Sequence, residues 1–406
     1  MEVKELYEMA RKIEQEQGKL YEEVCRQVYD YAELGCEEVK TSRYLTDMLA
    51  KLGFTVTFPY GGLDTAFKAE YGSGHPKVAF LAEYDALPGY GPNHDQNGHA
   101  CGHNWIAANT FGACAVLAAL AEHFTGTIVY MGCPAEEMLG GKVNMVDNGC
   151  FDDIDAAMQI HIAGGDETKI AGQSLAIDSV EFTYYGKASH AAGHPENGIN
   201  ALDACYLMFD GVNALRQHTT PDSRIHGIIV NGGGAPNVVP NFAKSRFMVR
   251  AAERSYLKGL TEKVINCARG AALMTGATME WRYYENSYDN MKLQPELISR
   301  FAECLKEAGV EKVDTQPQPP SGSTDVGNVA WVCPTVMGNM GVGNTDGSNC
   351  HDEEFLPYCI GDYGFKALHK AVLAQTFMAL QIFTDGKLQE ILAEEKKKLL
   401  AEKAAQ

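Results

Sequence analysis

Short apolar runs of the β-strand type alternate with helical segments along most of this chain. Strands are expected at residues 54–58, 65–71, 78–84, 127–131 and 156–162, and helices at 37–52 and 104–123. Two apolar stripes nearer the start, at residues 6–13 and 21–31, predict two further helices. Strands that alternate with helices usually pair in parallel and are covered on both faces. The pattern therefore predicts a largely parallel α/β sheet between helical layers.

The alternation breaks near residue 174 and resumes after residue 290. In between, the expected order is β-α-β-β-α-β, which is the order of a ferredoxin-like unit. Its strands are expected at 179–185, 225–231, 245–251 and 278–284, and its helices at 197–217 and 255–274. We therefore expect an α/β domain of residues 1–174 and 289–406 that carries an inserted α+β domain of residues 175–288.

The composition excludes several classes of partner. A net charge of −19 argues against nucleic acid and against anionic membranes, because phosphate binding needs clustered Lys and Arg. The first residues, MEVKELYEMARKIEQEQGK, lack the apolar core of a secretory signal, and no apolar stretch is long enough to span a bilayer. The 12 cysteines show no short-spaced disulfide framework. These features predict a cytoplasmic protein with reduced cysteines.

The segment Gly98–Asn104, with the sequence GHACGHN, carries the strongest chemical signal. A thiolate at Cys101 and an imidazole at His103, on a loop that leads into a helix, can bind one metal ion together. Gly98 and Gly102 permit the backbone angles that let the two side chains converge, and the helix N-terminus favours the thiolate. A buried free cysteine beside loop histidines explains this segment alone equally well.

Four other residues, in three segments, extend the signal. Glu136 and Glu137 follow the strand 127–131, where adjacent carboxylates point in different directions, although an acidic pair at a helix start is the simpler reading. His161 near the end of the strand 156–162 and His351 in a later loop are, taken singly, more typical of a core histidine and a surface histidine. All of them lie at predicted carboxyl ends of strands or in adjoining loops, where open α/β sheets place their sites.

Ordered motifs connect these positions. They are LAEYDALP at 81–88, HACGHN at 99–104, CPAEE at 133–137, QIH at 159–161, GKASHAA at 186–192, NVVP at 237–240 and STDVGN at 323–328. In this order they resemble the M20 family of metallopeptidases and amidohydrolases, in its Cys-containing amidohydrolase branch. The resemblance covers nearly the whole chain. It implies a metal-dependent amidohydrolase or dipeptidase whose small substrate carries a free carboxylate, such as a dipeptide, an N-acyl amino acid or p-aminobenzoyl-glutamate.

The resemblance also implies a pair of divalent ions. Cys101 would bridge them, His103 and His161 would complete the coordination of one ion, and Glu137 and His351 that of the other. A cysteine ligand favours zinc, while the imidazoles and the carboxylate also admit manganese, cobalt or nickel.

Further roles follow from the same resemblance. Glu136 would be the general base, and Asp85 would support the geometry of the metal site. The inserted domain would act as a lid and as the interface of a homodimer, in which His190 reaches the active site of the partner. Asn237 and Arg250 would hold the carboxylate of the substrate.

The sequence departs from the family pattern at two positions, and two alternatives to a metal-dependent hydrolase need to be considered. Glu83 stands where the wider family has a metal-binding histidine, so we expect it outside the ligand set, and Asn104 stands where the branch often has aspartate. The chain could instead be a non-catalytic or accessory subunit of a hetero-oligomeric hydrolase, but the presence of Glu136 with all five ligands favours an enzyme. A structural-zinc protein would need CxxC spacing, which the chain lacks.

Overall fold

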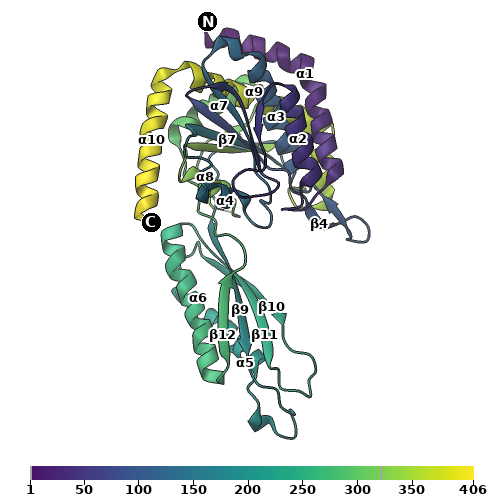
Figure 1. The fold of residues 1–406 in the computed structure, drawn as a ribbon, viewed down its shortest axis with the longest axis vertical. Helices are drawn as coiled ribbons and strands as arrows, with labels where there is room; N and C mark the ends of the chain where they lie inside the picture. Colours follow the sequence, from purple (N-terminus) through teal and green to yellow (C-terminus); the bar gives the residue numbers. More distant parts are fainter. Residues whose placement is uncertain (1, 321) are drawn as a thin grey trace. The chain divides into compact units, whose positions relative to one another are not determined.

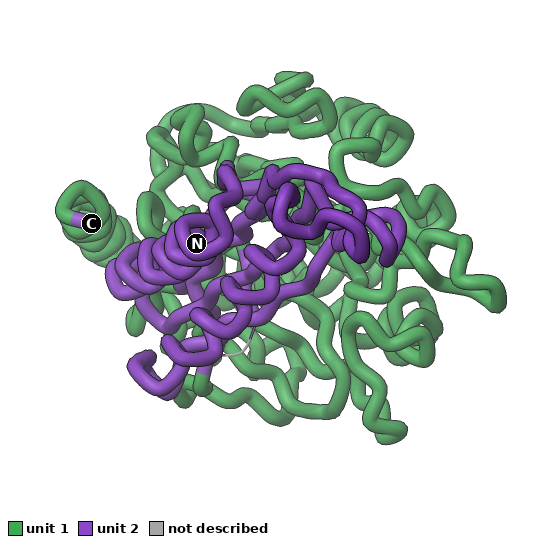
Figure 2. The backbone as a smooth tube through the Cα atoms, turned by 90° about the horizontal axis from the view of Figure 1, so that it is seen from below, with its two compact units in different colours: residues 1–173, 291–319, 325–405 green, residues 174–290, 320–324, 406 purple. Residues whose placement is uncertain are grey.

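The computed structural model describes residues 2–320 and 322–406 and divides into two compact units, coloured separately in Figure 2. Unit 1 comprises the residues up to Gln173 together with Met291–Pro319 and Asp325–Ala405. Unit 2 comprises Ser174–Asn290, Pro320–Thr324 and the terminal Gln406. The chain therefore enters unit 2 a second time, just before Asp325, which the sequence pattern did not indicate.

Unit 1 is built on an eight-stranded sheet with the order β1-β2-β6-β3-β7-β14-β8-β13 (Figure 1). The strands are β1 (Thr55–Thr57), β2 (Phe67–Ser73), β3 (Lys77–Ala82), β6 (Gly126–Gly132), β7 (Ala156–Ala163), β8 (Thr168–Lys169), β13 (Val313–Asp314) and β14 (Thr335–Gly341). The four central strands, β6, β3, β7 and β14, are parallel to one another. The predicted α/β fold with a mostly parallel central sheet is confirmed.

Helices cover both faces of this sheet (Figure 1). They are α1 (Val3–Tyr31), α2 (Val39–Lys51), α3 (His103–Ala119), α4 (Gly141–Asp147), α7 (Pro295–Glu307), α8 (Val326–Ala330), α9 (Asp362–Thr384) and α10 (Gly386–Ala405). Successive residues of a strand point to opposite faces. Accordingly, Val78 and Phe80 of β3 pack with α1, α3 and α9, while Ala79 and Leu81 pack with α4 and α8.

The first helix corrects one expectation. The sequence predicted two helices before residue 32, whereas the structure has the single 29-residue helix α1. Gly18, which separates the two apolar stripes, does not end the helix. A Cβ atom at Gly18 would lie 2.7 Å from the His369 ring, so the glycine allows the close approach of α9.

Unit 2 is a four-stranded antiparallel sheet with the order β10-β11-β9-β12 (Figure 1). Its elements are, in chain order, β9 (Ala176–Tyr185), α5 (Ala201–Leu215), β10 (Arg224–Asn231), β11 (Phe242–Ala251), α6 (Arg254–Thr275) and β12 (Thr278–Tyr283). This is the element order of a ferredoxin-like unit. Phe182 of β9 and Phe247 of β11 belong to the core under the two helices, so the opposite face of the sheet carries no helix of this unit.

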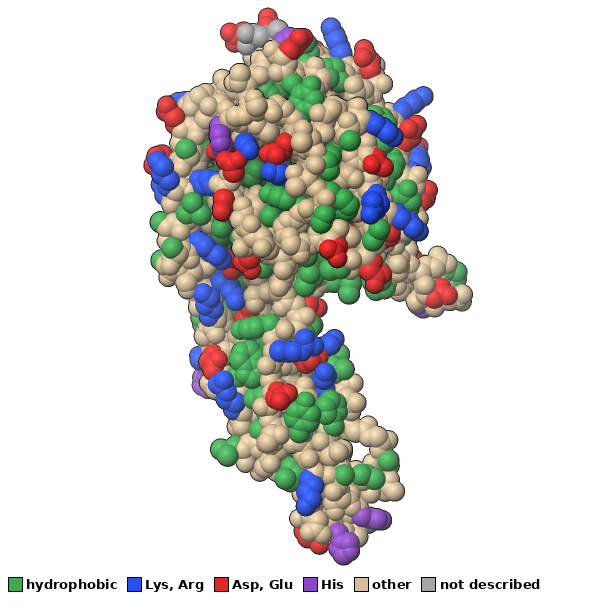
Figure 3. Space-filling model, viewed as in Figure 1, with side chains coloured by type: hydrophobic (Ala, Val, Ile, Leu, Met, Phe, Trp, Pro, Cys, Tyr) green, Lys and Arg blue, Asp and Glu red, His purple; other side chains and the backbone are tan. Residues whose placement is uncertain are grey.

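Among the described residues, no helix is both long and apolar enough to cross a membrane. On the face drawn in Figure 3, acidic and basic side chains are interspersed and do not form one continuous basic patch.

Candidate active site

The predicted site residues of unit 1 gather where the parallel strands end. Because β3, β6, β7 and β14 run in the same direction, their carboxyl ends share one edge of the sheet. The side chains at this edge are Glu83 and Asp85 after β3, Glu136 and Glu137 after β6, His161 in β7, His351 after β14, and Cys101 and His103 at the start of α3. The edge is the place where open α/β sheets bind their ligands.

His103 is the first residue of α3 and is fully buried. Gly102 before it has φ of 71°, and a Cβ atom there would lie 2.2 Å from Ile162, so only glycine allows this turn. His103 Nδ1 lies 2.7 Å from Asp85 Oδ1, to which it donates its proton. His103 Nε2 is then the nitrogen with the free lone pair. The second Asp85 oxygen accepts the backbone N–H of Glu137 at 2.9 Å, so Asp85 fixes two candidate ligands.

His161 is oriented in a similar way. Its Nδ1 lies 2.6 Å from the carbonyl oxygen of Ile162, so the proton resides on Nδ1. Its Nε2 lies 3.5 Å from the sulfur of Cys101, which is almost fully buried. The Nε2 atom of His161 and the sulfur of Cys101 therefore face each other.

Glu137 and His351 form the other side of the cluster. Glu137 Oε1 lies 3.2 Å from His351 Nε2 and 3.9 Å from His103 Nε2. His351 has φ of 76°, and its backbone N–H donates to Ala100, which fixes this loop beside Cys101. Positive φ is uncommon for a residue other than glycine, although histidine adopts it more often than most, and such conformations cluster at functional positions.

These side chains fit a metal centre. Zinc bonds of about 2.0–2.3 Å at tetrahedral angles place neighbouring ligand atoms about 3.3–3.6 Å apart, close to the separations of 3.5 Å and 3.2 Å found here. Among the described residues, neither His103 Nε2 nor Glu137 Oε1 makes a well-aligned hydrogen bond, although both atoms are buried and Glu137 Oε1 lies 3.2 Å from His351 Nε2. Buried polar atoms without partners are costly in a folded protein. A cation between them would satisfy both.

The candidate ligands form two groups with one shared member. Cys101, His103 and His161 have ligand atoms within 4.8 Å of one another, and so do Cys101, Glu137 and His351. Cys101 is therefore the side chain common to both groups.

The backbone before Glu136 has an unusual conformation. Ala135 before the pair has φ of 58°, and its N–H donates to the buried carboxylate of Glu38 at 2.8 Å. Glu136 lies in one group with His103 and Glu137, and in another with Glu83 and Asp325. Burial, followed by the charges of Glu83 and Asp325, raises the pKa of Glu136 well above its usual range. A carboxyl group of this kind is suited to accept a proton.

A buried lysine beside the site was missed by the sequence reasoning. Lys142 Nζ lies 2.5 Å from Glu83 Oε1 and 2.6 Å from Asp325 Oδ1, and all three side chains are almost fully inaccessible. Glu83, which we expected outside the ligand set, has its other oxygen 3.6 Å from His103 Nε2. A lysine in the first turn of a short helix carries no signature in the sequence, so only the structure reveals this contact.

Asn104 does not support His103. Its amide nitrogen donates to the carbonyl oxygens of Cys25 and Cys359 at 3.3 and 3.1 Å. Asn104 therefore joins α3 to α1 and to the turn before α9.

The unit 2 candidates fall at opposite ends of its sheet. His190 and Asn237 lie beside each other, because His190 pairs with Val238 and the Ala191 N–H donates to Asn237. His190 Nδ1 accepts the N–H groups of Ala192 and Gly193 at 3.2 and 3.1 Å, so its exposed Nε2 carries the proton.

Arg250 lies near the far end of β11, eight residues after Phe242, or roughly 27 Å along the strand. Its Nη1 donates to Ser323 at 3.1 Å, while its buried Nε has no partner and the guanidinium forms no ion pair among the described residues. One carboxylate cannot contact both Arg250 and Asn237 of the same chain.

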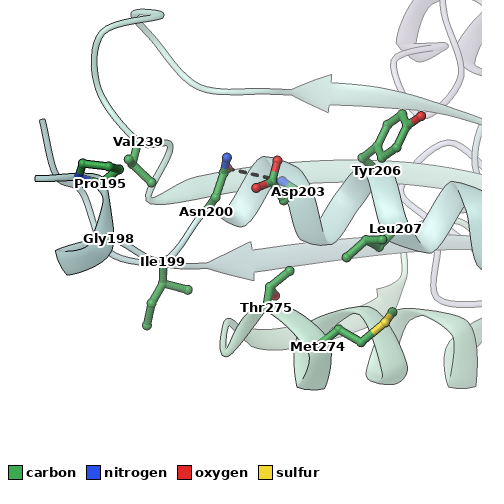
Figure 4. Close-up of a pocket in the computed structure, with 10 residues that line it drawn as sticks. All are labelled: Pro195, Gly198, Ile199, Asn200, Asp203, Tyr206, Leu207, Val239, Met274 and Thr275. Atoms are coloured by element: carbon green, nitrogen blue, oxygen red, sulfur yellow. Dashed lines mark hydrogen bonds between the residues drawn. The ribbon is translucent and has the colours of Figure 1, made fainter. Parts of the chain in front are cut away.

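A separate hollow of 610 Å³ lies within unit 2, between α5 and the end of α6 (Figure 4). Asp203 is the only acidic side chain that lines it, and no histidine or cysteine does. The hollow therefore lacks the residues for metal binding.

Comparisons with known proteins agree with this geometry. The model of peptidase family M20/M25/M40 matches residues 79–385. The Xaa-Arg dipeptidase of Mus musculus is 39% identical over 310 residues, which cover 73% of this chain and 69% of the mouse protein. One of the two matching subunits of the p-aminobenzoyl-glutamate hydrolase of Escherichia coli K12 is 37% identical, over 65% of this chain and 57% of its own length.

A solved Bacillus subtilis structure, described as a dinuclear metal-binding peptidase from the M20 family, has the same fold. Its TM-score is 0.66 at 20% identity, and the alignment covers 91% of this chain and 99% of that one. The match to the family model and the identity to the mouse protein assign the chain to the family that its ordered motifs predicted. The chain belongs to peptidase family M20/M25/M40 and is a hydrolase of that family.

Proposed function

We propose that this protein is a two-metal amidohydrolase that cleaves the amide bond of a small substrate bearing a free carboxylate, such as a dipeptide. The observation that carries the proposal is the pair of ligand groups that share Cys101. Cys101 would bridge the two ions, with His103 and His161 on one and Glu137 and His351 on the other. Zinc suits the thiolate best, and manganese, cobalt or nickel would also suit the imidazoles and the carboxylate.

When bound, the ions polarise the scissile carbonyl group and make water a stronger nucleophile at neutral pH. Glu136 accepts the proton of the attacking water and passes it to the leaving amine. Asp85 keeps the proton of His103 on Nδ1, so that Nε2 faces the site. These are the parts that the chain itself supplies to the reaction.

Arg250 is proposed to bind the carboxylate of the substrate. A partly buried guanidinium with a partnerless Nε and no ion pair among the described residues is available for a bidentate carboxylate. The relatives named Xaa-Arg dipeptidase and p-aminobenzoyl-glutamate hydrolase act, by their names, on such amides. We therefore propose dipeptides, N-acyl amino acids or p-aminobenzoyl-glutamate as the substrate class.

Metal removal tests the central claim. Chelation should abolish hydrolysis of a dipeptide and N-acyl amino acid library, and zinc, manganese or cobalt should restore it. Full activity of protein shown by elemental analysis to be free of metal would refute the proposal. Cys101→Ala should lower the occupancy of both ions, and loss of only one would exclude the bridging role.

We further propose that the working unit is a homodimer formed through unit 2, in which His190 acts on the partner's active site. The Nε2–H of His190 is an exposed donor suited to a developing oxyanion. The wide separation of Asn237, which precedes β11, and Arg250, near the far end of β11, also favours two chains. One substrate could then contact Asn237 of one chain and Arg250 of the other.

The edge strand β10 supplies a surface for a second copy. It lies at the end of the sheet order, and its residues Ile228, Ile229 and Val230 are 64%, 42% and 45% exposed. Unpaired edge strands with exposed aliphatic side chains readily pair with another strand. Pairing with the same strand of a second copy would be two-fold symmetric, as dimers require.

Subunit mixing tests the exchange of His190. The inactive variants Glu136→Gln and His190→Ala are mixed under conditions that exchange subunits. If His190 acts on the partner, the mixed dimer regains one complete site, and activity returns. Absence of activity despite proven exchange would reject this role and leave the metal chemistry untouched.

An accessory role within a hetero-oligomeric hydrolase is the second candidate, because one relative is named as a subunit of its enzyme. Activity of the isolated, metal-loaded chain would exclude it, and a requirement for a second, different chain would support it.

A further inference from the structure

Three carboxylates, Glu83, Glu136 and Asp325, offer oxygen atoms within 4.8 Å of one another, next to the proposed ligands. By donor type and spacing, this acidic pocket could hold a divalent ion of its own, since carboxylate oxygens suit magnesium, calcium and manganese. It adjoins His103, whose Nε2 lies 3.6 Å from Glu83. An ion there would bind Glu136, the proposed general base, and withdraw its carboxylate from proton transfer.

The pocket already contains a cation. The Lys142 ammonium lies 2.5 Å from Glu83 and 2.6 Å from Asp325, and its side chain is completely inaccessible. The backbone N–H of Lys142 donates to the second oxygen of Asp325 at 2.9 Å, so one residue binds both oxygens of that carboxylate. Burial opposes the charge of Lys142, but Asp325 and Glu83 raise its pKa well above the ordinary value, so the ammonium remains charged.

A contribution to stability does not explain why these three charged side chains are buried together. Exposed pairs stabilise a protein little, and a buried pair usually contributes less than well-packed apolar residues would. Here one positive charge serves two carboxylates that come from distant parts of the chain, after β3 and at the start of α8. The cost of burying these charges suggests that their location matters to the site.

We propose that the Lys142 ammonium is a built-in cation of the active site, which fills the acidic pocket of Glu83, Glu136 and Asp325 and so excludes a divalent ion from it. Lys142 is a positioning residue in this view. It keeps Glu83 and Asp325 in place and leaves the carboxylate of Glu136 for proton transfer. The inference rests on the proposed metal centre, and it states that no divalent ion binds in the neighbouring acidic pocket.

Metal stoichiometry tests the inference. Wild-type protein, Lys142→Met and Lys142→Met/Asp325→Asn are dialysed against Mn²⁺, and the bound manganese per chain is measured by elemental analysis. Methionine has a similar length and no charge. We expect two ions in the wild type, a third in Lys142→Met, and two again in the double variant, which has one carboxylate fewer. We also expect Lys142→Met to lower kcat much more than it changes KM, because Glu136 would become a ligand.

Lys77→Met is the matched control. Lys77 also binds two carboxylates, Glu70 at 3.3 Å and Asp153 at 2.6 Å, but it lies at the opposite end of β3 from the site. Its removal should leave the stoichiometry and kcat unchanged. A folded Lys142→Met variant that binds as many ions as the wild type, with the same kcat, would overturn the inference.

Crystals of the wild type provide a second measurement if Lys142→Met does not fold. After a manganese soak, the anomalous difference map should show no ion between Glu83 and Asp325, and a peak there would overturn the inference. Absence of bound manganese anywhere in the wild type would instead refute the proposed metal centre, so the two failures are distinguishable.

Discussion

Replacement of Asp85 by asparagine is the sharpest test of how the proposed metal centre is held. Asp85 uses one oxygen to accept the proton of His103 Nδ1 at 2.7 Å and the other to accept the Glu137 N–H at 2.9 Å. Asparagine has only one oxygen. If that oxygen faces His103, the amide NH₂ meets the Glu137 N–H, and two donors oppose each other. If it faces Glu137, the NH₂ forces His103 Nδ1 to accept, which moves the imidazole proton to Nε2.

Either orientation weakens one proposed ligand. Loss of a residue that orients a metal-binding histidine typically costs roughly 10–100-fold in metal affinity, which corresponds to about 1.4–2.7 kcal/mol. We therefore expect Asp85→Asn to raise the dissociation constant for zinc by a factor in this range. Competition with a chromogenic chelator measures the change.

A matched control exists on the surface. Asp155 also accepts a backbone N–H, that of Lys77 at 2.6 Å, and lies 2.6 Å from His75 Nδ1. Asp155→Asn should leave zinc affinity unchanged. An Asp85→Asn variant that binds zinc as tightly as the wild type would refute the role assigned to this carboxylate.

Other variants separate the remaining roles. Glu136→Gln should retain both metals but lower kcat by roughly 10²–10⁴-fold, whereas Glu137→Gln should lower metal occupancy. Kinetics and elemental analysis of both variants measure these effects, and the opposite assignment of the two effects would show that the roles of Glu136 and Glu137 are exchanged. Arg250→Ala should raise KM for substrates with a free carboxylate and reduce the ratio of their kcat/KM to that of the matching carboxamides. An unchanged ratio would show that Arg250 does not bind the substrate carboxylate. Burial, with a further contribution from the Asp85 charge, raises the pKa of Glu38 from 4.5 to about 7. The folded chain therefore binds this proton more tightly than the unfolded chain, so the contribution of Glu38 to stability is complete below about pH 4 and is lost as the pH rises through 7. Urea unfolding of metal-free Glu38→Gln should show a smaller decline over that window, and identical declines would contradict the assignment.

The sequence predicted the parallel sheet of unit 1 because the signals for its strands are local. Each of β3, β6 and β7 is a short apolar run of the type that parallel sheets bury on both faces. The motifs that follow these strands lie at one edge because the strands are parallel. That geometry explains why Cys101, Glu137 and His351, far apart in the sequence, form one group in the structure.

Contacts that depend on several distant segments were not predictable in this way. Glu38 supports the Ala135 backbone from the start of α2, and nothing in its surroundings marks it as buried. The single helix α1 was predicted as two helices because its apolar residues form two stripes. Gly18 lies between the stripes, and the reason for a glycine there is the approach of His369 from the distant helix α9. Asn104 stands where the resembling branch often has aspartate, and the sequence indicated no partner for it; its amide binds the carbonyl oxygens of Cys25 and Cys359, which come from distant segments.

The environment of His103 shows how such contacts complete the site. Its ring lies between two carboxylates that are only two residues apart in the sequence, Asp85 at Nδ1 and Glu83 at Nε2. Glu83 would also attract a proton onto Nε2 if its charge were unopposed, and a protonated Nε2 cannot bind a metal. Lys142 lies 2.5 Å from Glu83 and offsets that charge. Lys142 thereby weakens the pull of Glu83 on a proton at Nε2, while Nδ1 donates to Asp85 and Nε2 lies on the side of Glu137 and the proposed metal centre.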